Sequence, residues 1–236
     1  MNIKGVEMVN VKINGKWDIL LPKHRADRPE WYTEKGWEKP RLNSLNEHLG
    51  ANDILFYVGA EEGDMPALCQ MWGAKVALFE PNPKVWANIK AIWDANNLAY
   101  PYSFVGFASD RSTSGGIYHN NFPECAEGEI ISNHGFLELR DRNAPEITLD
   151  KFSELVDMVP TAISMDVEGS EWHVLKGAEQ LILKHHPKLW VSVHPEFMFS
   201  HFGEYSYDMR NWIKDRGYTE TFLDYQHELH VLYLPI

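Results

Sequence analysis

Short apolar runs recur along the chain, and stretches with helical spacing separate them. Strands buried on both faces of a parallel sheet have such continuous apolar sequences. Because the runs alternate with helical segments, the pattern indicates an α/β fold built on a mainly parallel sheet. The predicted strands cover residues 54–58, 75–79, 102–107, 161–165 and 189–193.

Three segments between or after these runs have the spacing of amphipathic helices. The first is predicted to begin at Pro83, which suits a first helical turn, with Asn82 as its N-cap. Another is predicted near residues 206–216. The helix that begins at Pro83 has an apolar face of Val85, Ile89, Ile92 and Trp93. A further predicted helix has an apolar face of Val174, Ala178, Leu181 and Ile182.

Antiparallel pairs are predicted at both ends of the chain. Residues 8–21 alternate apolar and polar around Asn14-Gly15, a dipeptide that favours a tight hairpin turn. Residues 218–223 and 229–234 flank a short linker, which predicts an antiparallel pair at the sheet edge. Residues 110–145, rich in Gly, Ser, Asn and Arg, are interpreted as an insertion with no assigned strand.

The segment 22–41 holds three prolines, with Trp31, Tyr32 and Trp37 among charged residues. Two interpretations stay open for it: a lid, or an aromatic strap packed on the domain surface. The length and the 44% hydrophobic content suit one α/β domain over residues 1–236. Within it, residues 1–42 form the N-terminal hairpin and aromatic strap, and residues 43–236 form the core.

Composition and net charge limit the partners and the compartment expected for this protein. The net charge of −12, with no cluster of Lys and Arg, disfavours nucleic acid as a partner. Cys69 and Cys125 lack metal-binding spacing and fit a reducing compartment. With no apolar run of signal-peptide or membrane-spanning length, we expect a cytoplasmic protein with no membrane partner. The oligomeric state is left open.

A glycine-rich loop, GAEEGD, follows the strand at residues 54–58. Gly59 and Gly63 let the backbone approach a ligand at the carboxyl end of the strand. Glu80, at the end of the next strand, is placed to accept hydrogen bonds from ribose hydroxyls. Three carboxylates in the loop disfavour pyrophosphate, and hence an NAD-dependent oxidoreductase, and favour a cationic nucleoside such as S-adenosylmethionine. The alternative is a structural turn with a helix-capping acid.

A second candidate cluster lies where the strand at 161–165 ends. Asp166, Glu168 and Glu171 surround Gly169, which allows a sharp turn, and His194 ends the neighbouring strand. Asp166 and His194 are therefore predicted to face one crevice, as candidates for a general base. For Glu171, a role in complementing the dipole of the following helix is the alternative.

A divalent metal is a variant of this prediction. Asp166, Glu168, His194 and Glu196 are ligand types that suit Mg²⁺ or Mn²⁺. Nothing in the sequence brings the four side chains together, so the metal-free route is preferred and no metal ligand is assigned.

These motifs together resemble the FkbM-type family of class I S-adenosylmethionine-dependent methyltransferases. The resemblance spans residues 50–220, and the D-V-E-G-x-E turn is its most specific part. Tyr57 stands where the family often has Asp, and Glu61 where it often has Asn. The matching segments are 57–63 (D-x-G-A-N-x-G), 80–83 (E-P-N-P), 166–171 (D-V-E-G-x-E), 175–178 (L-K-G-A), 147–152 and 191–197.

The resemblance implies a Rossmann-like class I fold, with a mainly parallel seven-stranded sheet and an antiparallel edge hairpin. It also implies methyl transfer from S-adenosylmethionine to an oxygen of a carbohydrate or other small molecule. The alternative is a non-catalytic module that keeps the fold and binds a nucleoside or a partner. The expected cofactor residues are Gly59, Ala60, Glu61, Gly63, Glu80, Pro81, Asn82, Ala108, Ser109 and Asp166, with the adenine near Phe107 to Ser109, and the expected catalytic residues are Asp166, His194, Glu168 and Glu171.

Overall fold

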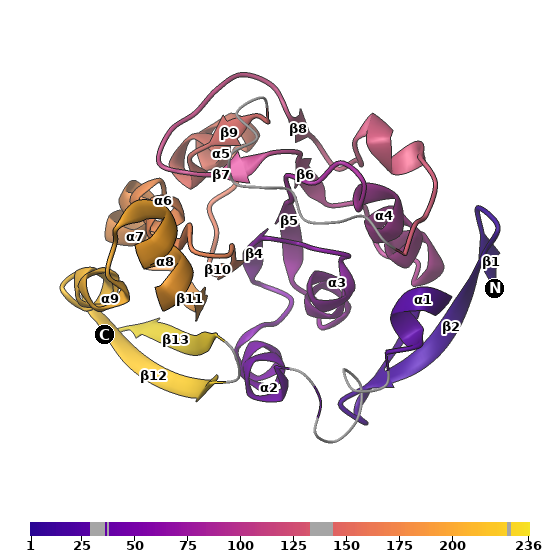
Figure 1. The fold of residues 1–236 in the computed structure, drawn as a ribbon, viewed down its shortest axis with the longest axis horizontal. Coiled ribbons are helices and arrows are strands. Elements are labelled where there is room, and N and C mark those ends of the chain that lie inside the picture. The colour runs from indigo at the N-terminus through magenta and orange to yellow at the C-terminus, as the bar shows by residue number, and fades with distance from the viewer. Residues whose placement is uncertain (29–35, 37, 133–143, 226–227) are drawn as a thin grey trace.

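An eight-stranded sheet crosses the centre of the computed structural model, which describes residues 1–28, 36, 38–132, 144–225 and 228–236 (Figure 1). The strand order is β12-β13-β11-β10-β4-β5-β6-β8. The parallel strands are β4 (Ile54–Val58), β5 (Lys75–Phe79), β6 (Tyr102–Phe104), β10 (Ala162–Asp166) and β11 (Lys188–Val193). The antiparallel strands are β8 (Ile117–Tyr118), β12 (Tyr218–Tyr225) and β13 (Leu229–Pro235).

The predicted α/β architecture with an antiparallel edge pair is therefore confirmed. The predicted strand count of seven is wrong, because the segment at residues 117–118, within the predicted insertion, pairs with β6 as an eighth strand. The short helical turn η2 (Glu124–Glu127) lies in the same insertion.

Helices cover both faces of the sheet. Successive side chains of a strand point to opposite faces, so Phe56 and Val58 belong to one apolar cluster and Leu55 and Tyr57 to the other. The first cluster packs beneath α5 (Leu149–Val156), α6 (Glu171–Lys176), α7 (Glu179–His185), α8 (Pro195–Phe202) and α9 (Ser206–Lys214). The second packs beneath α2 (Lys39–His48), α3 (Asp64–Met71) and α4 (Trp86–Ala95).

Two predicted helices differ from the observed ones. The Asn82 side chain accepts a hydrogen bond from the Lys84 amide (3.1 Å), which forms a local turn, and α4 begins only at Trp86. The second helix is divided into α6 and α7 at Gly177. A Cβ on Gly177 would lie 2.0 Å from the carbonyl oxygen of Ser109, so glycine permits a close contact there.

The predicted strand 102–107 is also wrong in extent. It ends at Phe104, and the chain then leaves the sheet so closely beside Pro145 that a Cβ on Gly106 would lie 2.2 Å from the Pro145 carbonyl oxygen. Beyond this point β7 (Phe107–Ala108) pairs with β9 (Glu146–Ile147) as a separate two-stranded sheet.

The N-terminal hairpin is confirmed. Strands β2 (Val6–Ile13) and β3 (Trp17–Pro22) pair across a turn in which Asn14 (φ 51°) and Gly15 (φ 68°) are both left-handed, and β1 (Asn2–Ile3) joins them. The short helix α1 (Lys23–Ala26) follows. The aromatic residues of the predicted strap lie outside the described residues, so the choice between lid and strap stays open.

Both cysteines are free thiols, and Cys69 is buried. In the described part of the chain, no helix combines the length and apolar content that a membrane crossing needs.

Candidate active site

The loop after β4 packs tightly against the end of β10. Gly59 has φ 80°, and a Cβ on it would lie 1.9 Å from the carbonyl oxygen of Asp166. The amides of Gly59 and Ala60 both donate to the Phe79 carbonyl, at 2.9 and 3.1 Å. Gly63 (φ 91°) then begins α3. Glycine at position 59 is therefore required by chain packing, and this packing brings the loop beside Asp166.

The acidic loop does not present three open carboxylates to a ligand, and this part of the sequence argument is corrected. Arg25 from α1 is buried and donates to Asp64 at 2.8 Å, with Glu61 and Glu62 at 3.6 and 3.8 Å. Glu62 also pairs with His24 (2.9 Å). Burial would raise the pKa of Glu62, but the hydrogen bond with His24 and the charge of Arg25 outweigh it and lower the pKa to about 2. Of the three, only the Glu61 side chain is largely exposed, at 62%.

Glu80 connects the end of β5 to the loop. Its carboxylate is buried and accepts hydrogen bonds from the amides of Glu61 (3.0 Å) and Asn82 (2.8 Å), one on each oxygen. Burial raises the pKa of Glu80 to about 7, although the two amides act in the opposite direction. A carboxylate has about four acceptor positions, so Glu80 retains capacity for further donors.

Ala108 lies in the small β7–β9 sheet, and Ser109 follows it directly. The Ser109 amide donates to Ile147 (2.9 Å), and its carbonyl contacts Gly177. Neither residue lines the pocket described next, nor do Gly63, Glu80, Pro81 and Asn82.

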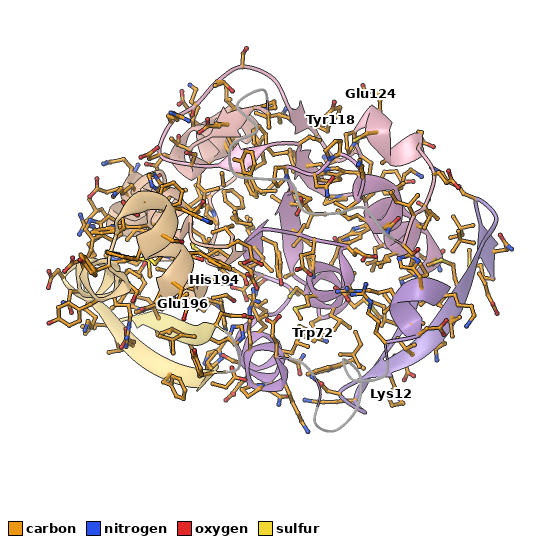
Figure 2. The ribbon with its side chains drawn as sticks, in the orientation of Figure 1. Lys12, Trp72, Tyr118, Glu124, His194 and Glu196 are labelled. Carbon is orange, nitrogen blue, oxygen red and sulfur yellow. The ribbon has the colours of Figure 1, made fainter. Side chains whose placement is uncertain are left out.

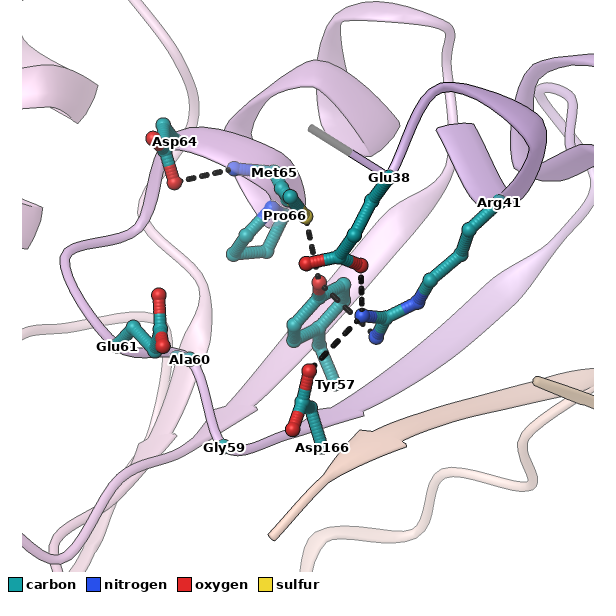
Figure 3. Close-up of a pocket in the computed structure, with 10 residues that line it drawn as sticks. All are labelled: Glu38, Arg41, Tyr57, Gly59, Ala60, Glu61, Asp64, Met65, Pro66 and Asp166. Atoms are coloured by element: carbon teal, nitrogen blue, oxygen red, sulfur yellow. Dashed lines mark hydrogen bonds and ion pairs between the residues drawn. The ribbon is translucent and has the colours of Figure 1, made fainter. Parts of the chain in front are cut away.

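A small pocket opens at the carboxyl ends of β4 and β10, next to α2 and α3 (Figure 3). Figure 3 shows Glu61 across the pocket from Arg41 and Asp166. In an α/β sheet, ligands bind outside the carboxyl ends of strands where the strand order reverses, and β4 and β10 adjoin there. The lining residues are Glu38, Arg41, Tyr57, Gly59, Ala60, Glu61, Asp64, Met65, Pro66 and Asp166.

Arg41 organises one wall of this pocket and was missed by sequence reasoning. Arg41 is 1% exposed, and its guanidinium donates to Ser164 (3.0 Å). It also donates to Asp166 (3.1 Å), to Tyr57 (3.4 Å) and to Glu38 (Figure 3). Asp166 lies 125 positions away, so no local pattern signals this network. One oxygen of the predicted catalytic carboxylate is thus already paired with a cation.

His194 and Asp166 lie on adjacent strand ends, as predicted. His194, at the start of α8 (Figure 2), is 7% exposed, and its Nε2 lies 3.6 Å from Asp166 and 3.6 Å from Glu168. Its Nδ1 contacts Glu171 at 2.6 Å. Burial would lower the pKa of His194, but the hydrogen bond to Glu171 and the neighbouring carboxylates raise it to about 9.

Glu171 makes specific hydrogen bonds, so it does more than complement the dipole of α6. It is fully buried, and one oxygen bonds both the Gly169 amide (3.0 Å) and His194. Glu168, by contrast, is 43% exposed and left-handed (φ 52°). The predicted catalytic set therefore converges, with Glu171 behind His194 and Glu168 toward solvent, while Glu196 is exposed and does not join it (Figure 2).

Comparison with known proteins decides the family. A family model described as the methyltransferase FkbM domain matches residues 48–220. The chain belongs to this family. The resemblance and the Rossmann-like fold expected from the sequence are both confirmed, and the fold neighbours below are methyltransferases of the same architecture.

The chain is similar to several known proteins in sequence or in fold. It is 29% identical over 142 residues to hexuronic acid methyltransferase AglP of Haloferax volcanii, covering 59% of this chain and 56% of that protein. It also resembles the FkbM methyltransferase structure from Methylobacillus flagellatus (TM-score 0.55, 20% identity, 79% of this chain, 44% of that one). An rRNA methylase from Streptococcus thermophilus matches in fold (TM-score 0.51, 10% identity, 83% and 94%). The chain spans about half the length of the first two proteins.

Two departures from the FkbM pattern have structural counterparts. Glu61 has φ 46°, a left-handed conformation that Asn adopts more readily than Glu. Tyr57 is buried with its hydroxyl 3.4 Å from Arg41. Burial raises the pKa of Tyr57 well above its usual value, so this position carries a neutral hydroxyl where the family often has a carboxylate.

Proposed function

We propose that the FkbM domain is an S-adenosylmethionine-dependent methyltransferase that methylates a hydroxyl oxygen of a carbohydrate or another small molecule. One observation carries the proposal. Gly59 of the cofactor loop packs directly on Asp166, whose carboxylate faces the pocket and His194. The loop and a carboxylate that can accept a proton therefore meet at one sheet edge.

The residues around the loop fit the cofactor. We assign the ribose hydroxyls to Glu80, which has acceptor capacity left beside its two amide bonds. The exposed Glu61 carboxylate is assigned to the cationic end of the ligand. The adenine is assigned to the side of Ala108 and Ser109, just beyond the end of β6, the strand next to β5.

Methyl transfer to a hydroxyl requires the acceptor oxygen to lie in line with the methyl donor and to lose one proton. S-adenosylmethionine supplies a methyl group on a positively charged sulfur, which the acceptor oxygen displaces from that carbon. We assign the hydroxyl proton to the carboxylate of Asp166, which lies 3.6 Å from His194; the raised pKa of His194 keeps that ring protonated at neutral pH. Arg41 fixes the second oxygen of Asp166 at 3.1 Å and keeps that carboxylate in place.

A carbohydrate acceptor is supported by the relative named as a hexuronic acid methyltransferase. The net charge of −12 disfavours a nucleic acid, whose phosphates would be repelled. Solved rRNA methylases share the fold, but at about 10% identity they support no acceptor.

The test follows methyl transfer from labelled S-adenosylmethionine to a panel of hexuronic acids, neutral sugars and RNA. We expect a hydroxyl compound to accept label, and Asp166→Asn and His194→Ala to lower turnover about 100-fold with cofactor affinity nearly unchanged. Labelled RNA would overturn the acceptor assignment. Binding of S-adenosylhomocysteine with no transfer to any acceptor would favour the non-catalytic module.

A further inference from the structure

Three side chains at the edge of the pocket converge on one point. The carboxylates of Asp166 and Glu168 and the Nε2 of His194 lie within 4.8 Å of one another. They come from the end of β10, the turn after it and the end of β11. Two carboxylates and one imidazole form a ligand set that suits a divalent cation such as Mn²⁺.

His194 is held in the orientation that a metal ligand requires. Its Nδ1 bonds the fully buried Glu171, and its ring stacks on Phe197 at an interplanar angle of 11°. Histidines that bind metals usually donate their other ring nitrogen to such a carboxylate, which fixes the tautomer and the ring direction. Glu171 therefore directs Nε2 toward Asp166 and Glu168.

Among the described residues, the Nε2 of His194 faces three carboxylates. It lies 3.6 Å from Asp166, 3.6 Å from Glu168 and 3.9 Å from Glu228, too far for a hydrogen bond. Ligand atoms about 2.1 Å from an octahedral ion stand about 3.0 Å apart in adjacent positions and about 4.2 Å apart in opposite ones. The two separations of 3.6 Å between Nε2 and the carboxylates of Asp166 and Glu168 lie between these values, so small side-chain adjustments would bring the three groups into ligand positions.

The charges around His194 also favour a bound cation. Four carboxylates (Asp166, Glu168, Glu171 and Glu228) lie within 4 Å of the His194 ring nitrogens, and Glu171 and Glu228 are buried. Arg41 pairs with Asp166 from the opposite side. A bound cation stabilises carboxylates that gather at one point.

We propose that Asp166, Glu168 and His194 bind a divalent cation, with Glu171 as the positioning residue for His194. Three protein ligands leave coordination positions for water or for an acceptor hydroxyl. Resting on the proposed function, the further consequence is that the cation binds the acceptor oxygen and lowers the hydroxyl pKa, so that Asp166 and His194 act as ligands in place of a base and the proton passes to water.

The experiment titrates Mn²⁺ into the protein and follows free Mn²⁺ by electron paramagnetic resonance. We expect saturable binding to the wild type. Glu168→Gln replaces a ligand whose side chain is 43% exposed, so it leaves the fold intact and weakens binding at least about tenfold. Glu171→Gln is expected to weaken it by about 10- to 100-fold. The matched control is Glu196→Gln, an exposed acid at the same sheet edge, with unchanged binding.

An unchanged free Mn²⁺ signal with the wild type would overturn the site. So would an equal loss in Glu196→Gln and Glu168→Gln, because binding would then be nonspecific. Calorimetry with S-adenosylhomocysteine on the same samples separates the two proposals. Cofactor binding without Mn²⁺ binding refutes the cation site alone, whereas Mn²⁺ binding without cofactor binding upholds the site and refutes the methyltransferase proposal.

Discussion

Replacing Arg25 by Met should strongly destabilise the GAEEGD loop (residues 59–64). Arg25 is 2% exposed and reaches from the N-terminal segment to the acids of the loop, with Asp64 at 2.8 Å. Asp64 and Glu62 are themselves buried, at 4% and 3% exposure. Removing the guanidinium leaves these carboxylates in place without their shared cation.

The loss of unfolding free energy depends on the hydrogen bonds that the loop carboxylates keep. Breaking a buried ion pair by removing one partner costs about 3–5 kcal/mol. Glu62 keeps hydrogen bonds with His24 (2.9 Å) and Asn88 (3.1 Å), whereas Asp64 keeps the Met65 amide (3.0 Å). Because part of the loop stays satisfied, we expect the lower end, about 3 kcal/mol. For a chain of this size, that lowers the melting temperature by about 6–12 °C.

Urea unfolding followed by circular dichroism measures the loss. Lys23→Met is the matched control, since Lys23 belongs to the same helix and pairs with Asp27, with side chains 52% and 59% exposed. An exposed pair of this kind contributes under about 1 kcal/mol. If Arg25→Met loses less than about 1 kcal/mol, or no more than Lys23→Met, the claim that Arg25 neutralises the loop fails.

Two further predictions concern the loop and the end of β5. Gly59→Ala places a Cβ 1.9 Å from a backbone oxygen and should cost more than about 3 kcal/mol of unfolding free energy. The control Gly5→Ala, at φ 82° with open space around it, should cost about 1–2 kcal/mol. Equal losses in the two variants would refute the packing argument. Burial raises the pKa of Glu80 from 4.5 to about 7. The protonated carboxyl therefore stabilises the native state by about 3 kcal/mol below pH 4.5. This stabilisation is lost as the pH rises through 7. Glu80→Gln should lack this loss, and parallel pH profiles of urea unfolding for the two proteins would contradict it.

The sheet and the loop could be predicted because their signals are local. The boundaries of β4 and β5 match the apolar runs, and the turn residues that follow them are glycines and acids. The extra strand at residues 117–118 is two residues long, too short for any periodic pattern. The break after Phe104 depends on Pro145, a contact between residues distant in sequence.

The placement of Asp166 and His194 on adjacent strand ends could be predicted, because each directly follows an apolar run. Buried arginines escaped prediction, because a lone Arg in a polar segment has no periodic signature and its burial depends on partners far along the chain. Arg25 contacts Asp64 and Arg41 contacts Asp166, at separations of 39 and 125 residues. The same contacts explain why the charge argument from the GAEEGD loop was incomplete.

The central claim is that Glu80 and the Gly59 loop bind S-adenosylmethionine. Calorimetry with S-adenosylhomocysteine on the wild type, on Glu80→Ala and on the control Glu124→Ala tests it most directly. Glu124 is an exposed acid that accepts a hydrogen bond from Tyr118, away from the loop (Figure 2). We expect the wild type and the control to bind equally, and Glu80→Ala to lose about 1–3 kcal/mol, or about 5- to 150-fold in affinity. No binding to the wild type, or equal affinity in Glu80→Ala, would contradict the claim.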